Sequence, residues 1–200
     1  MQHDLPGLVE LFGGPKPFSN QMTRMFNEGL GCATYEWPSR LPDSTGMVGQ
    51  FVMGNEPSFH VPYLYNFAGE PWKTQKLVRK LLEAWFRNDL MGIPGDEDGG
   101  GMTSFVVWSS LGLYPVTPGK AEYTIGSPVF PEARMHLSNG RTFEIIAHGA
   151  SRDNKYIQSA TLNGKPLDKP FLSHEDLMAG GRLVLEMGAE PAPDWGRAAE

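Results

Sequence analysis

The feature that most constrains the fold is a change in residue pattern close to Pro118. Before this proline, apolar side chains recur at helical spacing, most regularly in the segment Trp72–Asn88. After it, short β-prone runs alternate with turn pairs such as Asn139-Gly140. Helices followed by strands predict an α+β chain. We expect a helical region over residues 1–118 and a small antiparallel β-rich region over residues 119–200.

The first half of the chain predicts several helices separated by breaks. An early apolar patch ends at Gly13-Gly14-Pro15, and Ser19 is placed to cap the next helix. Residues 29–50 lack a clear period and predict a long loop, of a kind that is more often functional than idle. Residues 57–67 predict a buried helix that ends near Gly69.

The segment Trp72–Asn88 is strongly amphipathic, and Pro71 suits its first turn. A further apolar helix is expected over Met102–Leu113. The predicted buried face of the amphipathic segment consists of Leu77, Val78, Leu81, Leu82, Trp85 and Phe86, and the predicted solvent face of Lys73, Lys76, Arg79, Lys80 and Glu83.

The second half predicts short strands, with a hairpin around Asn139-Gly140. The tail beyond Glu190 is rich in proline and alanine and is expected to fray. The expected strands are Glu122–Ile125, Ala133–Leu137, Thr142–Ala147, Ile157–Leu162 and Arg182–Met187.

Charge and cysteine content narrow the possible partners. The net charge is −6 and no basic run is present, which argues against nucleic acid or an anionic membrane as a partner. The lone Cys32 excludes an internal disulfide and argues against a thiolate zinc site. No run of about 18 apolar residues exists, so we expect no membrane span.

The segment Gly95-Asp96-Glu97-Asp98-Gly99-Gly100-Gly101 is the most distinctive stretch of the chain. Three adjacent carboxylates resist simultaneous ionisation, so they must be hydrated, bind a cation or hold a raised pKa. The glycines let the backbone turn sharply and a ligand come close. Val107 stands where an EF-hand needs a bidentate glutamate, so that motif does not match. The segment predicts either carboxylate chemistry or a solvated loop that caps the next helix.

Asn55 and Glu56 form a second candidate site, directly before Pro57. Amide and carboxylate oxygens are donors that Ca²⁺ prefers, and helix capping is the alternative explanation. His60 lies among aromatic residues and is interpreted as a hydrogen-bonded core residue. The chain contains no P-loop, dinucleotide fingerprint, Gly-x-Ser-x-Gly elbow or His-Glu-x-x-His motif. Nucleotide-binding, serine-hydrolase and zinc-protease functions are therefore not expected.

Several unusual motifs follow one another along the chain. They are Asp4-Leu5-Pro6-Gly7-Leu8-Val9-Glu10-Leu11, Gly54-Asn55-Glu56-Pro57-Ser58, Pro62-Tyr63-Leu64-Tyr65-Asn66, Gly69-Glu70-Pro71-Trp72-Lys73-Thr74-Gln75, Gly95-Asp96-Glu97-Asp98-Gly99-Gly100 and Leu111-Gly112-Leu113-Tyr114-Pro115-Val116. Together they resemble glycoside hydrolase family 92, which contains calcium-dependent exo-α-mannosidases. Their number and order make the resemblance more specific than any single motif.

The resemblance implies both a fold and an activity. Residues 1–118 would form the last part of an (α/α)6 barrel, and residues 119–200 the strands that pack back on it. The implied reaction is hydrolysis of terminal α-linked mannose, preferentially α-1,2, with inversion and with calcium as cofactor. The implied substrates are mannose-containing glycans such as N-glycans or mannan.

The resemblance also implies roles for individual residues. Asp98 matches the general base that activates water, and Asp96 the second carboxylate that supports it. Asn55 and Glu56 match the metal-binding motif, and Glu56 and Glu97 are expected to bind substrate. Many relatives carry Asn-Asp-Asp at the acidic positions, and in that register Glu97 takes the place of Asp96.

One part of the implied machinery has no counterpart in this chain. The general acid of the family is a glutamate just upstream of the segment that matches residues 3–7, and Glu10, Glu28 and Glu36 lie in other contexts. We therefore expect it to precede Met1, so that the chain belongs to a longer protein and is inactive alone. The alternatives are a non-catalytic carbohydrate-binding or structural remnant and, less favoured, a lyase or phosphorylase with a similar barrel. Family members are usually exported, which suggests a secreted or periplasmic protein.

Overall fold

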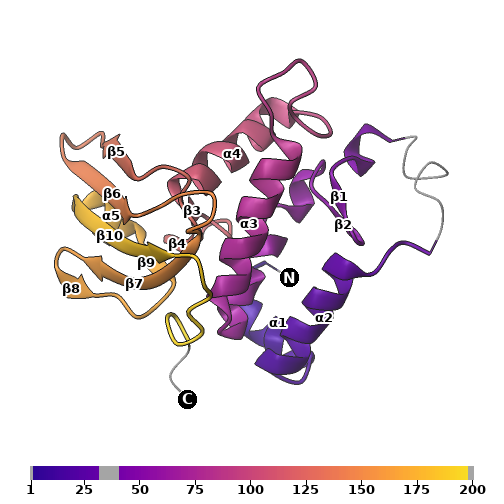
Figure 1. Cartoon of the computed structure of the whole chain (residues 1–200), viewed down its shortest axis with the longest axis horizontal. Helices are drawn as coiled ribbons and strands as arrows, with labels where there is room; N and C mark the ends of the chain where they lie inside the picture. Colours follow the sequence, from indigo (N-terminus) through magenta and orange to yellow (C-terminus); the bar gives the residue numbers. More distant parts are fainter. Residues whose placement is uncertain (1, 32–40, 198–200) are drawn as a thin grey trace.

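The computed structural model describes residues 2–31 and 41–197 and combines helices with three sheets. The two larger sheets occupy the left of Figure 1, and the amino-terminal helices and the small two-stranded sheet the right, with α3 between them. The α-helices are α1 (Leu5–Leu11), α2 (Pro15–Asn27), α3 (Pro71–Trp85), α4 (Gly101–Leu111) and α5 (His174–Met178), and the 3₁₀ helices are η2 (Pro42–Ser44), η3 (Glu56–Ser58), η4 (Val61–Ala68) and η5 (Asp98–Gly100).

Helix α2 begins earlier than the sequence indicated. Pro15 opens the helix and Gly14, at φ 105°, is its N-cap. A proline is preorganised for the first helical turn, so it starts the helix four residues before the predicted cap. Ser19 therefore does not cap the helix: it is fully buried inside α2 and donates a hydrogen bond to Glu70.

Helix α3 confirms most of the predicted amphipathic pattern. Leu77, Val78, Leu81 and Leu82 are buried, while Trp85 and Phe86 are half-buried. The placement of Arg79 in solvent is wrong, because its side chain is only 4% exposed. Its guanidinium donates to the carbonyls of Pro128 and Ser151, each at 2.8 Å. These distant carbonyls supply the polar partners that a buried guanidinium needs.

The remaining helical predictions hold with changes of detail. The segment around residues 57–67 is helical but of 3₁₀ type, and it ends at Gly69 with φ 70°. Helix α4 stops at Gly112 and leaves Val107 58% exposed. The predicted loop 29–50 is described only in part, because residues 32–40, which include Cys32 and Glu36, lie outside the described residues. Its described part contains η2 and the short strand β1 (Met47–Val48). Strand β1 pairs with β2 (Phe51–Val52).

The strand predictions are accurate to within a residue or so at each end. The predicted hairpin is formed by β5 and β6. The region is not purely antiparallel, because β10 pairs in parallel with β6 and antiparallel with β7. The larger sheets contain β3 (Leu113–Tyr114), β4 (Glu122–Ile125) and β9 (Phe171–Ser173) in the order β3-β4-β9, and β5 (Glu132–His136), β6 (Thr142–His148), β7 (Tyr156–Leu162), β8 (Lys165–Pro166) and β10 (Gly181–Gly188) in the order β5-β6-β10-β7-β8.

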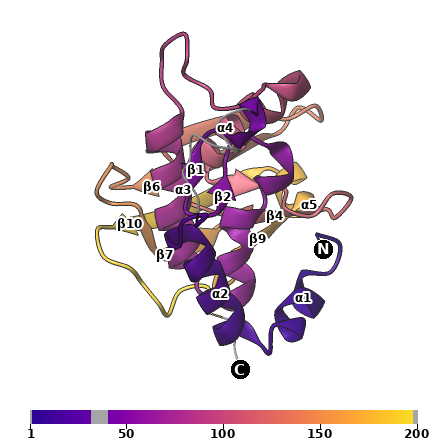
Figure 2. The same cartoon turned by 90° about the vertical axis from the view of Figure 1, so that its right-hand side faces the viewer.

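Two hydrophobic clusters lie on either side of a polar seam. One is built mainly from α1–α4 and η4, and the other mainly from the two larger sheets together with Leu177 and Trp195. In Figure 2, which is viewed from the helical side, α2 lies in front of the two larger sheets. Across the seam, Asn66 donates to the carbonyl of Ile125 at 2.8 Å, and Gln75 accepts from the amide of Ile157 at 3.1 Å. The division at residues 118/119 stays a prediction.

The end of the chain is more ordered than its composition indicated. Trp195 is 7% exposed and its indole N–H donates to the carbonyl of Leu167 at 3.0 Å. Burial of this aromatic ring holds the tail against the sheets through that residue. No helix within the described ranges is long and apolar enough to cross a membrane.

Candidate functional site

Backbone contacts bring the two predicted site segments together. The amide of Gly54 donates to the carbonyl of Thr45 at 3.0 Å, and the amide of Gly95 donates to the Thr45 hydroxyl at 2.5 Å. Thr45 therefore joins the turn that carries Asn55 and Glu56 to the acidic loop that carries residues 96–98.

Two glycines allow this close approach. At Gly95, φ is 68° and an added Cβ would lie 2.0 Å from the carbonyl oxygen of Gly54. At Gly101, an added Cβ would lie 3.0 Å from Cγ of Glu56. Larger residues would push the segments apart, so the glycines fix the distance between Glu56 and the acidic loop.

Glu56 is the most perturbed carboxyl group of the site. Its Oε1 atom is buried and has no hydrogen-bond partner among the described residues. Burial raises the pKa of Glu56, and the neighbouring carboxylates of Asp98 and Asp43 raise it further, while its own backbone amide opposes the shift. Two ionised carboxylates cannot hydrogen-bond each other, so the contact between Glu56 and Asp98 favours one shared proton or a bound cation.

Asp98 reaches this position through an uncommon backbone conformation. Its φ is 46°, in the left-handed region that non-glycine residues seldom adopt. Gly99 follows at φ 67° and Gly100 at φ 105°. The exposed Asp98 side chain thus lies beside Glu56 at the beginning of α4. Strained residues of this kind cluster at functional sites.

Glu97 turns toward α4 and caps it. Its Oε1 atom accepts from the hydroxyl of Thr103 at 2.5 Å and from the Thr103 amide at 3.3 Å, and its carbonyl accepts from the amide of Gly100. The capping alternative thus applies to Glu97, although its Oε2 atom is buried without a partner among the described residues. Asp96 is exposed, and no hydrogen bond or ion pair within the described part of the chain holds it.

Asn55 does not cap the helical turn that follows it. It occupies the N-cap position of η3, but its side chain makes no capping hydrogen bond. Its carbonyl instead accepts from the amide of Ser58 at 3.0 Å. Among the described residues, no hydrogen bond holds the Asn55 side-chain amide.

His60 only partly matches its prediction. The ring is half-buried, and burial lowers the pKa of His60, so the imidazole is neutral at pH 7. Its Nδ1 atom is buried without a hydrogen-bond partner among the described residues.

The donors fit one side of a calcium shell. Ca²⁺ takes six to eight oxygen ligands, and the orphaned Glu56 oxygen next to a second carboxylate is a suitable pair. Within residues 2–31 and 41–197, however, no group of three or more His, Cys, Asp or Glu side chains is arranged to hold a metal. The chain's own residues therefore fit as part of a shell and not as a complete one.

Sequence reasoning missed three residues that shape the site. Asp43 acts on Glu56 electrostatically from η2, and Thr45 and Thr103 fix the two ends of the acidic loop. Only Thr103 carried a signal, because a hydroxyl residue at the start of a predicted helix is a typical capping partner.

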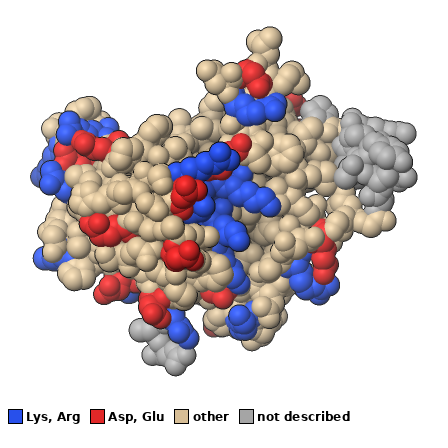
Figure 3. Space-filling view, viewed as in Figure 1, with Lys and Arg blue, Asp and Glu red and all other residues tan. Residues whose placement is uncertain are grey.

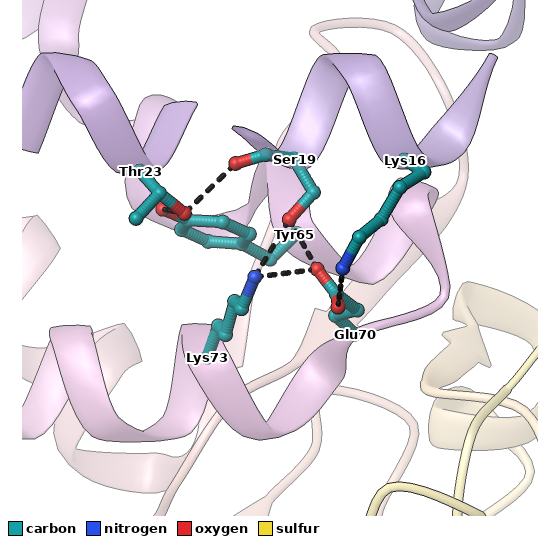
Figure 4. Close-up of polar contacts among 6 residues, drawn as sticks. All are labelled: Lys16, Ser19, Thr23, Tyr65, Glu70 and Lys73. Carbon is teal, nitrogen blue, oxygen red and sulfur yellow. Dashed lines mark hydrogen bonds and ion pairs between the residues drawn. The ribbon is translucent and has the colours of Figure 1, made fainter. Parts of the chain in front are cut away.

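A second glutamate, Glu70, lies in a satisfied polar cluster between α2 and α3 (Figure 4). Lys73 donates to Glu70 at 2.7 Å and to Ser19 at 2.9 Å, Ser19 also donates to Glu70, and Lys16 lies 3.7 Å away. Burial opposes ionisation of Glu70, but the hydrogen bonds from Lys73 and Ser19 dominate and lower its pKa. This cluster stabilises the packing of the two helices.

Comparison with known proteins identifies the family of this chain. The profile of the glycosyl hydrolase family 92 catalytic domain matches residues 1–189. The chain belongs to this family. It is also 31% identical, over 197 residues, to an uncharacterized secreted glycosidase of Arthroderma benhamiae, covering 97% of this chain and 23% of that protein.

Solved structures of family 92 enzymes share the fold. A GH92 α-mannosidase from Bacteroides thetaiotaomicron, in complex with mannoimidazole, superposes with a TM-score of 0.88 at 30% identity, covering 98% of this chain and 25% of that one. A GH92 inverting mannosidase from the same organism gives a TM-score of 0.83 at 35% identity, covering 98% and 27%. The chain therefore spans about a quarter of the length of the family members it matches.

Proposed function

We propose that this chain is the carboxyl-terminal part of a catalytic domain that hydrolyses terminal α-linked mannose with inversion. Family membership and the similarity to structures named as α-mannosidases support the activity. The observation that carries the proposal is the approach of Glu56 to Asp98 across two loops that glycines hold together. In the whole protein, α1–α4 and η4 form the last part of an (α/α)6 barrel.

In this proposal, Asp98 is the general base that takes a proton from the attacking water. The residue is exposed and lies in the left-handed turn, so a water can reach it. Inversion requires a proton donor roughly 6.5–9.5 Å away on the other side of the sugar. We place that donor in the part of the whole protein that precedes Met1. Asp96 is the second, supporting carboxylate.

Glu56 and Asn55 bind mannose hydroxyls and supply part of a calcium shell, and Glu97 lies at the edge of the sugar site. A bound calcium ion would supply positive charge that favours ionisation of both Glu56 and Asp98 and would orient sugar hydroxyls. The proposed substrates are mannose-containing glycans with terminal α-1,2 linkages, such as N-glycans or mannan. We also infer export, because a similar protein is named as secreted.

The test is turnover of α-1,2-mannobiose by the full-length protein that contains this chain. Removing a general base typically costs about 10²–10⁴-fold. We expect a loss of this size in kcat for Asp98→Asn, and no loss for Asp168→Asn, which changes an exposed aspartate elsewhere. NMR of the first-formed sugar should detect β-mannose. Full activity in Asp98→Asn would refute the proposal, and binding without hydrolysis in the wild type would favour a non-catalytic carbohydrate-binding remnant.

A further inference from the structure

A cationic groove runs along α3, away from the site described above. Figure 3 shows Lys and Arg side chains gathered in the middle of the face that Figure 1 presents, over α3. This positively charged surface contrasts with the net charge of the whole chain, which is −6. Two cavities of about 300 Å³ and 360 Å³ adjoin there and share Lys76 and Lys80. We call these two cavities the α3 groove.

The larger cavity of the groove is strongly positive. Its lining includes Arg152, Lys155 and the buried Arg79 together with the two shared lysines, against the single carboxylate of Glu83. Glu83 already pairs with Arg152 at 3.2 Å. Arg79 donates its hydrogen bonds to the neutral carbonyls of Pro128 and Ser151, and the charge of Glu83, which is already paired with Arg152, also acts on it.

The smaller cavity combines aromatic and polar side chains. Trp72 and Tyr65 line it together with Thr23 and Asn27, beside Lys73. Lys73 lies 5.4 Å from the centre of each aromatic ring and is held by Glu70. An aromatic face next to hydroxyl and amide groups suits a sugar ring, whose faces are apolar and whose edges carry hydroxyls.

We propose that the α3 groove binds an anionic glycan. The sugar ring lies against Trp72 in the smaller cavity, and a phosphate or similar anionic substituent lies between Lys76 and Lys80 on the way to the larger one. Both lysines are exposed, and no ion pair within the described part of the chain occupies them. An acidic peptide would match the charges of the groove but would not use its aromatic half.

The groove is independent of the proposed hydrolytic site. None of its lining residues belongs to the acidic loop or to the turn that carries Asn55 and Glu56. The proposal goes beyond the hydrolysis of mannose and gives the protein a second point of attachment to a charged glycan. Two linked contacts raise the effective affinity for a polymer more than either contact alone.

The experiment is calorimetric titration, at low salt, of the full-length protein that contains this chain with mannose 6-phosphate, inorganic phosphate, mannose and a polyglutamate peptide. We expect mannose 6-phosphate to bind most tightly. Its affinity should fall as added salt screens the charges of the lysines. Charge-assisted hydrogen bonds to the phosphate are lost in Lys76→Glu/Lys80→Glu, so this double variant should bind roughly tenfold more weakly or worse. Trp72→Ala should weaken the binding of mannose 6-phosphate but not the binding of inorganic phosphate.

A matched variant controls for net charge. Lys165→Glu/Lys169→Glu changes two exposed lysines elsewhere by the same amount and should bind like the wild type. Asp98→Asn should also bind normally, which separates this proposal from the proposed hydrolysis. Four results would each overturn the proposal. They are equal affinity for phosphate and mannose 6-phosphate, tighter binding of polyglutamate than of mannose 6-phosphate, equal loss of affinity in the two double variants, and no binding at all.

Discussion

Glu56 and Glu70 occupy similar places in the sequence, since each directly precedes a proline in the first turn of a helix. Their surroundings are opposite. Glu70 accepts hydrogen bonds from Lys73 and Ser19, and its pKa is lowered. Glu56 has a buried oxygen without a partner among the described residues, and burial and Asp98 raise its pKa.

In our proposal, the Glu-Pro pair at Glu70 serves packing and the pair at Glu56 serves chemistry. A carboxylate whose bonds are satisfied by the protein has nothing left to offer a ligand. A carboxylate left unsatisfied beside another one costs stability unless a proton, a cation or a substrate hydroxyl compensates. We therefore place function at Glu56 and stability at Glu70.

The largest expected effect separates the two glutamates by activity. In the full-length protein, Glu56→Gln should lower kcat/KM on α-1,2-mannobiose by about 10²-fold or more, because a preorganised charged contact to the sugar is lost. Glu70→Gln should retain activity within about threefold at a temperature where both variants are folded. Equal losses in the two variants would break the comparison.

Stability should respond in the opposite order. Glu70→Gln should destabilise the chain by about 1–3 kcal/mol at pH 7, because it weakens charge-assisted bonds to Lys73 and Ser19. Because the pKa of Glu70 is lower in the folded chain than in the unfolded chain, ionised Glu70 stabilises the fold at pH values above its unfolded pKa. This stabilisation is lost as the pH falls through its folded pKa. Denaturant unfolding should therefore show the difference shrinking below about pH 4. Glu28→Gln, in an exposed pair with Arg24, serves as the control and should cost less than about 1 kcal/mol.

The acidic loop offers an intermediate effect. Thr103→Val removes the hydroxyl that holds Glu97, and a lost helix-capping bond costs about 0.5–2 kcal/mol. Because Glu97 precedes the left-handed Asp98, we expect turnover to fall by roughly tenfold in the full-length protein, with the fold retained. Thr103→Ser keeps the hydroxyl and should restore turnover. If serine and valine gave the same turnover, the contact would have no positioning role.

The smallest effect has the reverse sign. The pKa of Glu56 is higher in the folded chain than in the unfolded chain. Ionisation of Glu56 therefore destabilises the fold as the pH rises from its unfolded pKa through its folded pKa. Glu56→Gln removes this loss, so its Tm at pH 7 should lie slightly above that of the wild type. The gain should vanish near pH 4. A lower Tm at pH 7 would indicate that Glu56 is satisfied after all.

Local pattern predicted much of the fold but not its polar contacts. The helix over α3 and the strands after Pro118 follow from periodicity and turn residues, which act within a few positions. Arg79 and Ser19 were misplaced because their partners, Ser151 and Glu70, lie more than fifty residues away. The parallel pairing of β10 with β6 is likewise a long-range contact that turn residues do not encode.

The candidate site shows the same limit. Carboxylates and glycines in the acidic loop marked it as unusual, and the family resemblance joined it to Asn55 and Glu56. The joining contact itself passes through Thr45, which has no distinctive neighbours in the sequence. Glu97 caps α4 and Asp98 is exposed, although the two residues are adjacent. This separation of roles depends on the left-handed backbone of Asp98, which the sequence did not predict.

The contrast between the two glutamates can be measured directly by a carbon-detected NMR titration of the side-chain carboxyl groups of Glu56 and Glu70 in the same sample. We predict that Glu56 titrates above the usual glutamate value and Glu70 below it, and that Asp98→Asn lowers the pKa of Glu56. Contradiction would come from a Glu56 that titrates at or below Glu70, or that does not respond to the change at Asp98.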